Sequence, residues 1–171
     1  SEGWDIEAYS ARGRFPVADN PDDALIQIST TFQRYGEAEP YARTVVCFRE
    51  TAPVEGVAVS WYPTEHETIN AWARSLRDHS VDVMVSYNGS QFDWRYVAGR
   101  KEVLVDDDTG DELVELELLG KLLEGGGKAK EFELNSNAYG QNKFFVLDTP
   151  GMQHVDVLQL LRRDFKLPSY S

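Results

Sequence analysis

Several features are scarce or missing in this sequence. Cys47 is its single cysteine, which excludes an internal disulfide and favours a reducing compartment. The apolar residues around Cys47 predict a buried, unreactive thiol. No apolar run approaches the roughly 20 residues of a membrane-spanning helix, and the N-terminus shows no basic, apolar leader. We therefore expect an intracellular protein with no membrane partner.

Basic residues are also few. The chain holds 17 lysines and arginines against 29 aspartates and glutamates, for a net charge of −12. A free-standing nucleic-acid binder normally shows a basic surface, so this charge argues against one. The three histidines and one cysteine make no zinc-binding spacing. An acidic site for metal cations remains compatible with the composition.

The 171 residues, 42% of them apolar, predict one folded domain. Alternating and continuous apolar patterns predict strands and helices in mixed order, which indicates an α/β fold. Thr64 and Glu67 form a capping box that predicts a helix start. The expected strands are 4–9, 25–32, 43–48, 57–62 (an edge strand) and 81–87, the expected helices begin at 64, 92 and 155, and a hairpin joins 131–134 to 144–147.

The first acidic motif lies on the first expected strand. Alternate side chains of a strand share a face, so Asp5 and Glu7 point the same way and Ile6 points into the core. Two carboxylates on one face repel unless a cation neutralises them, and oxygen-only ligands suit Mg²⁺ or Mn²⁺. An exposed strand face or an ion pair is the alternative interpretation, and the motif by itself does not decide between them.

The second motif lies between the strand at 81–87 and the helix at 92–100. Asn88 and Gly89 begin a turn, and Phe92 and Asp93 begin the helix. Open α/β sheets place ligand groups at such strand-to-helix junctions. An ordinary turn followed by a first-turn helix acid would explain each piece alone.

Together these motifs resemble the 3′→5′ proofreading exonuclease domain of family B DNA polymerases. Asp5-Ile6-Glu7 is similar to its first motif, and the segment from Tyr87 to Asp93 is similar to its second. The resemblance is closest to the delta-type polymerases of large DNA viruses and covers nearly the whole chain. Further matching segments are Phe15-Pro16, Leu25–Ser29, Glu133–Ser136, Gly140–Asn142, Thr149–Gly151, Asp156–Gln159, Arg163–Leu167 and Ser169–Ser171.

The resemblance implies a ribonuclease H-like mixed sheet flanked by helices, with an inserted β-hairpin region. It implies two divalent ions, Mg²⁺ with Mn²⁺ as a substitute, and hydrolysis of the 3′-terminal phosphodiester of DNA. Asp5 would hold both ions, Glu7 one of them and Asp93 the other. Asn88 and Phe92 would lie near the frayed primer end.

Phe15 is a candidate to stack on a terminal base, and packing of its loop on the core is the equal alternative. The implied partners are the single-stranded 3′ end of primer DNA, the remainder of a parent polymerase chain and a sliding clamp. The implied location is the nucleus or a viral replication site. The −12 charge fits a nuclease domain embedded in such a polymerase.

The sequence departs from the family in two ways. The family has a third motif, Tyr-x-x-x-Asp, and no tyrosine between Tyr9 and Tyr170 is followed by aspartate four residues later. An apolar lead into the first motif is replaced by Ser1, Glu2 and Gly3. We therefore expect residues 1–171 to be a partial exonuclease domain, weak or inactive alone.

Three alternatives remain open from the sequence. The chain could be an inert scaffold or interaction domain of the same fold. It could be another metal-dependent nuclease of that fold, such as a ribonuclease. The acids could also be surface charge alone, with no role in metal binding.

Overall fold

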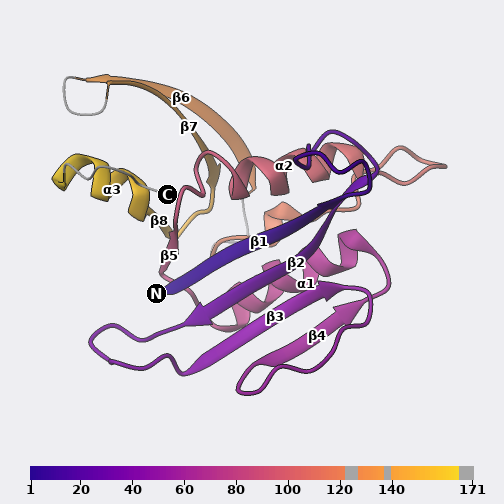
Figure 1. The fold of residues 1–171 in the computed structure, drawn as a ribbon, viewed down its shortest axis with the longest axis horizontal. Coiled ribbons are helices and arrows are strands. Elements are labelled where there is room, and N and C mark those ends of the chain that lie inside the picture. The colour runs from indigo at the N-terminus through magenta and orange to yellow at the C-terminus, as the bar shows by residue number, and fades with distance from the viewer. Residues whose placement is uncertain (122–126, 137–139, 166–171) are drawn as a thin grey trace.

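The structure is a computed structural model that describes residues 1–121, 127–136 and 140–165. Its main feature is a six-stranded mixed sheet in the order β4-β3-β2-β1-β5-β8 (Figure 1). The strands are β1 (Glu2–Ser10), β2 (Asp23–Phe32), β3 (Ala42–Phe48), β4 (Ala58–Tyr62), β5 (Val83–Ser86) and β8 (Gln153–Asp156). The helices are α1 (Glu65–Asp78), α2 (Asp93–Val103) and α3 (Val157–Asp164), with a 3₁₀ turn, η1, at Leu116–Leu118.

The central strand β1 has two kinds of neighbour. It pairs antiparallel with β2 along its whole length, with a register shift between Glu7 and Ala8. It pairs parallel with β5 only at Glu2 and Gly3. β2–β3 is antiparallel, whereas β3–β4 and β5–β8 are parallel. β1 and β5 therefore part after two residues of pairing.

A separate hairpin joins β6 (Lys128–Ser136) to β7 (Gly140–Asp148). Figure 1 shows it projecting from the sheet as a long curved ribbon. Its strands extend past the expected 131–134 and 144–147, and within these segments Glu131 pairs with Phe145 and Phe132 with Phe144. The hairpin contacts α2 through β7. The α/β class, the mixed sheet and the added hairpin are confirmed, and the arrangement is consistent with a ribonuclease H-like fold.

Three tryptophans form the centre of the core, one each from β1, α1 and α2. The Trp4 ring on β1 lies 4.9 Å from that of Trp72 on α1 and 4.4 Å from that of Trp94 on α2, centroid to centroid. The Trp72 indole N–H donates to Thr30 Oγ1 at 3.2 Å, which satisfies this buried polar group. Both helices thus pack on the Trp4 face of the sheet, and Asp5 belongs to the opposite face.

Local signals account for several element boundaries. Thr64 caps α1, since its Oγ1 accepts a hydrogen bond from the Glu67 amide nitrogen at 3.3 Å, and the Glu67 carboxylate accepts one from the Thr64 hydroxyl at 2.6 Å. β4 lies at the sheet edge as expected, and Cys47 is buried and free. Among the described residues no helix is long and apolar enough to cross a membrane.

One expected boundary is wrong. The expected helix from Val155 begins instead at Val157, because residues 153–156 form β8 and pair parallel with β5. Asp156 ends this strand and caps α3. The family-like residues from 166 to 171 lie outside the described part of the chain.

Candidate metal centre

The side chains of β1 alternate as the sequence predicts. Trp4 and Ile6 are buried in the core, whereas Asp5 and Glu7 are exposed on the other face. A depression of about 340 Å³ on that face is lined in part by Asp5, Ser29 and Arg43. The first acidic motif therefore faces solvent on the side of the sheet opposite α1 and α2.

The strand-to-helix junction brings the second acid to this strand. Asp93 is the first residue of α2 and is only 2% exposed. Its Oδ1 accepts a hydrogen bond from the Ile6 amide nitrogen at 3.3 Å. The bond is possible because β5 no longer pairs with β1 at this level, so the edge of β1 is open to a side chain.

Asp5 and Asp93 lie within interaction range of each other. Burial, the charge of Asp5 and a hydrogen bond between the two carboxyl groups together raise the pKa of Asp93 to about 7. The Ile6 amide acts in the opposite direction, lowering the pKa of Asp93. A buried carboxyl beside a second carboxylate needs either a proton or a cation. An oxygen-only pair of this kind suits Mg²⁺ or Mn²⁺.

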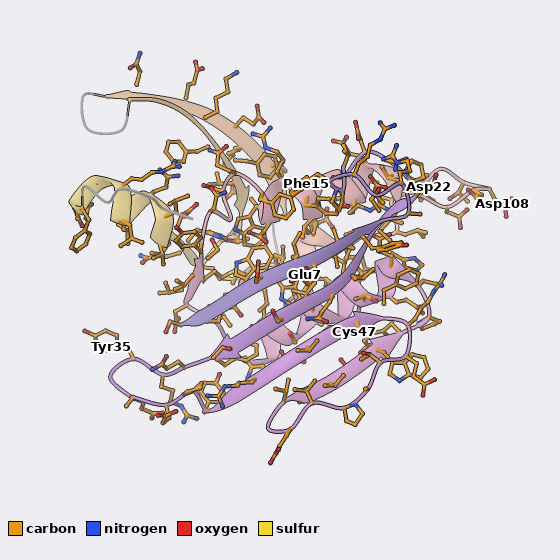
Figure 2. All side chains as sticks on the ribbon, in the orientation of Figure 1. Glu7, Phe15, Asp22, Tyr35, Cys47 and Asp108 are labelled. Carbon is orange, nitrogen blue, oxygen red and sulfur yellow. The ribbon has the colours of Figure 1, made fainter. Side chains whose placement is uncertain are left out.

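Glu7 is not part of this carboxylate pair. In residues 1–121, 127–136 and 140–165, no group of three or more His, Cys, Asp or Glu residues is arranged to hold a metal ion. Glu7 lies on β1 (Figure 2), and strand alternation places it on the same face as Asp5. The structure thus brings together Asp5 and Asp93, and the assignment of Glu7 as a ligand stays a prediction.

The turn before α2 is tightly bonded. Asn88 has φ 64°, a left-handed conformation that asparagine tolerates better than most residues. Its carbonyl accepts hydrogen bonds from the amide nitrogens of Gln91 at 3.0 Å and Phe92 at 3.1 Å. At Gly89 a Cβ would lie 2.3 Å from Ser86 Oγ and 3.5 Å from Asp93 Oδ2. Only glycine fits there, so the turn packs directly on the acid.

The sequence places Asp156 in a family-like segment but does not predict its contacts with this turn. Asp156 Oδ1 accepts from the Asn88 amide nitrogen at 2.9 Å, and Oδ2 accepts from the Ser90 amide nitrogen at 3.2 Å and from Ser90 Oγ at 2.6 Å. Oδ1 also caps α3 by accepting from the Leu158 amide nitrogen at 3.1 Å. An aspartate directly before a helical apolar pattern is a capping signal, but its second set of partners is 66–68 residues away.

Two aromatic residues meet at the entrance to the turn. The rings of Phe15 and Phe92 lie 5.3 Å apart in an edge-on arrangement. Phe15 is 73% exposed, so it does not anchor its loop to the core. Figure 2 shows it on the loop after β1, close to α2. The exposed ring of Phe15 therefore packs on Phe92, which is partly buried against the core.

The loop that carries Phe15 is held at its end by the buried residue Asp23. The Asp23 Oδ2 accepts from Arg12 Nη2 at 2.6 Å and from the Val17 amide nitrogen at 2.9 Å. Burial by itself would raise the pKa of Asp23, but hydrogen bonds from Ser10, Val17, Asn20 and Arg12 hold it well below its usual range. Asp23 is therefore ionised and ties both sides of the loop together.

A buried ion pair between the two helices supports the same loop. Arg100 on α2 pairs with Glu65 on α1, with Nε–Oε1 at 2.7 Å and Nη2–Oε2 at 2.8 Å. Arg100 also donates to the carbonyls of Ala18 at 3.0 Å and Asn20 at 2.7 Å. Glu65 Oε1 accepts from the Leu25 amide nitrogen at 2.9 Å. The two helices thus fix the backbone of residues 18–25.

An open α/β sheet with a carboxylate pair at the parting of two parallel strands defines a candidate metal-dependent enzyme domain. Residues 2–171 match the family described as DNA polymerase family B, exonuclease domain, and the chain belongs to that family. This confirms the resemblance drawn from the acidic motifs.

Individual relatives agree with the family assignment. The chain is 52% identical over 168 residues to a "DNA polymerase" of Paramecium bursaria Chlorella virus NY2A, covering 98% of this chain and 18% of the relative. It is 33% identical to the "DNA polymerase delta catalytic subunit" of Schizosaccharomyces pombe and 31% identical to that of Oryza sativa subsp. japonica, each over 98% of this chain. The chain spans 15% and 14% of those two relatives.

Proposed function

We propose that this chain is the proofreading domain of a larger DNA polymerase and that it contributes to hydrolysis of the 3′-terminal phosphodiester of DNA. The observation that carries the proposal is the Asp5–Asp93 pair, in which a buried carboxyl group adjoins a second one from another element. In the metal-free protein a proton must relieve this repulsion. Divalent cations would relieve it equally well and would fit the all-oxygen donors.

The residues have distinct proposed roles at this site. Asp5 would hold two Mg²⁺ or Mn²⁺ ions, Glu7 one of them and Asp93 the other. When bound, the two ions supply an activated water and stabilise the leaving 3′ oxygen. A third acid from a Tyr-x-x-x-Asp segment would complete the ligand set.

The aromatic pair would receive the DNA end. Phe15 is exposed and braced by Phe92, so its free face can stack on a terminal base, a contact worth about 1–3 kcal/mol in other single-strand binders. The anchored loop around Arg12 and Asp23 would keep that ring in place. Asn88 lies in the adjoining turn and would contact the same primer end.

The other proposed partners belong to the whole polymerase. They are the remainder of the polymerase chain, which would supply the positive charge that this domain lacks, and a sliding clamp. The viral relative is consistent with action at a viral replication site, and the delta-type relatives with action in a nucleus.

An inert scaffold is the second candidate. It is favoured by the absence of a three-carboxylate metal group among the described residues. The nuclease activity of a longer polypeptide, which continues past residue 171 through a Tyr-x-x-x-Asp motif, distinguishes the proofreading domain from the inert scaffold.

We expect the longer polypeptide to degrade single-stranded DNA from its 3′ end with Mg²⁺, and Asp5→Ala to abolish this. Residues 1–171 alone should be nearly inactive, because misplacement of catalytic groups by about 1 Å can cost on the order of 10²-fold in rate. No activity in the longer chain would favour the scaffold. Preference for RNA 3′ ends would favour a ribonuclease.

A further inference from the structure

The turn at residues 88–91 is the meeting point of three segments that are distant in sequence. It joins β5 to α2. Its Ser90 carbonyl accepts a hydrogen bond from the amide nitrogen of Phe145 on β7 at 3.2 Å, and its Asn88 and Ser90 amides donate to Asp156 at the start of α3. Gln91 Nε2 also donates to the Lys143 carbonyl of β7. The conformation of this turn is therefore fixed from outside as well as from within.

Asp156 provides the outside contact that only a carboxylate can make. Its two oxygens accept four hydrogen bonds, two from amide nitrogens of the turn, one from Ser90 Oγ and one from its own helix at Leu158. An ionised carboxylate accepts at both oxygens and donates nothing. The amide nitrogens of Asn88 and Ser90 converge on it, and among the described residues they donate to no other acceptor.

The turn at residues 88–91 limits where the Asp93 side chain can lie. The Gly89 carbonyl accepts from the Trp94 amide nitrogen at 3.0 Å, which ties the turn to the first residues of α2. The Gly89 backbone lies against Ser86 and the Asp93 carboxylate, as the space for a Cβ shows. A shift of Asn88 or Gly89 would therefore move the carboxylate relative to Asp5.

We infer that Asp156 is a positioning residue for the metal site: by holding Asn88 and Ser90 it keeps Asp93 in register with Asp5. This inference rests on the proposed function, since it concerns the same carboxylate pair. Asp156 does not touch the proposed ions and acts through the turn. Capping of α3 is its other role, and the test must separate the two.

Asp156→Asn separates the two roles. The asparagine oxygen can replace Oδ1, which keeps the α3 cap at Leu158 and the bond from Asn88, because asparagine is a good N-cap residue. Its NH₂ group then faces the Ser90 amide N–H and loses that bond. Ser90→Ala removes the 2.6 Å hydroxyl contact from the other side and leaves the α3 cap untouched. Thr64→Ala is the matched control, since it removes the cap of α1 far from the turn.

The primary measurement is the Mn²⁺ dissociation constant of the 171-residue chain, read from the electron paramagnetic resonance of free Mn²⁺. Amide hydrogen exchange at Ser90 and thermal melting accompany it. We expect Asp156→Asn and Ser90→Ala to weaken Mn²⁺ binding by about 10-fold, the lower end of what outer-shell changes cost. Exchange of the Ser90 amide should accelerate in Asp156→Asn, which removes the oxygen that accepts from it. Thr64→Ala should lower the melting temperature and leave Mn²⁺ affinity unchanged.

Each outcome decides the matter. Wild-type affinity in both Asp156→Asn and Ser90→Ala would overturn the positioning role and leave the proposed function standing. An equal loss of affinity in Thr64→Ala would also overturn it, because general destabilisation would then explain the effect. If the wild-type chain does not bind Mn²⁺, or if Asp5→Asn binds it as tightly as wild type, the proposed function fails and the positioning role fails with it.

Discussion

Asp93 reaches from the first turn of α2 to the backbone of β1, where its Oδ1 accepts a hydrogen bond from the Ile6 amide nitrogen at 3.3 Å. The two residues are 87 positions apart in the chain. The bond places the Asp93 carboxyl beside Asp5, whose side chain is the neighbour of Ile6 on the strand. Four experiments follow from this pair and from the loop and ion pairs around it.

Divalent ions should stabilise the folded chain. An ion that binds only the folded state adds about 2.7 kcal/mol at about 100 times its dissociation constant, and a chain of this size gains about 2–4 °C per kcal/mol. We expect Mg²⁺ or Mn²⁺ to raise the melting temperature accordingly in a thermal scan. Asp5→Asn should raise the melting temperature of the metal-free chain by removing repulsion, and should lose the response to metal.

Glu7→Gln is the matched control for Asp5→Asn, because Glu7 lies on the same strand face outside the carboxylate pair. It should leave the metal-free melting temperature unchanged. A weaker response to metal in Glu7→Gln would support Glu7 as a ligand. No response to any divalent ion in the wild-type chain would favour the surface-charge interpretation of the acids.

The stability of the metal-free chain should depend on Asp93 protonation. The pKa of Asp93 is raised from 3.8 to about 7, so its stabilising contribution is fully present below about pH 4 and is lost as pH rises toward 7. Burial raises the pKa of Glu2 to about 8, and this shift changes stability in the same direction. Burial lowers the pKa of His154 from 6.5 to about 4, so this residue acts in the opposite direction: its stabilising contribution is lost as pH falls from 6.5 toward 4.

Asp93→Asn isolates the first contribution in urea unfolding at several pH values. The difference in unfolding free energy between Asp93→Asn and wild type should grow in favour of the variant from pH 4 to pH 7. It should then level off. A difference that stays constant over this range would show that Asp93 titrates normally.

Phe15 should matter for DNA binding and not for folding. Its side chain is 73% exposed, so Phe15→Ala should leave the melting temperature nearly unchanged. We expect the variant to weaken binding of a single-stranded oligonucleotide by about 1–3 kcal/mol in a fluorescence anisotropy titration. Tyr35→Ala is the control, since Tyr35 is fully exposed on the loop between β2 and β3. Equal losses in both variants would contradict a specific role for Phe15.

Breaking the buried ion pair should destabilise the fold strongly. Arg100→Met leaves Glu65 buried without its partner, which costs about 3–5 kcal/mol in comparable pairs. Arg95→Met on the same helix breaks the exposed Arg95–Glu131 pair of 2.9 Å and should cost about 0–1 kcal/mol. Urea unfolding measures both. Similar costs for the two variants would show that burial of the Arg100–Glu65 pair has no special effect.

Local patterns in the sequence predict much of this fold. The burial of Trp4 and Ile6 and the exposure of Asp5 and Glu7 follow from strand alternation alone. The capping box at Thr64 and the position of Asp93 at a helix start were also correct. These features depend on neighbouring residues, so a single sequence carries enough information.

Long-range pairs could not be predicted in this way. β8 has four residues and includes Gln153, His154 and Asp156, which do not make an apolar strand pattern. Its pairing with β5 holds it in the sheet. The hydrogen bonds from Ser90 to Asp156 and from Arg100 to Glu65 join residues 66 and 35 positions apart, and no local spacing indicates them.

The alternation of acidic and apolar side chains along β1 also bears on how the chain avoids misfolding. A slip of β1 by one residue would turn Asp5 and Glu7 into the tryptophan cluster and expose Ile6. The same slip would present a different amide to Asp93. Misaligned forms would thus bury unpaired charge, so the acids proposed for metal binding also favour the correct alignment of the central strand during folding.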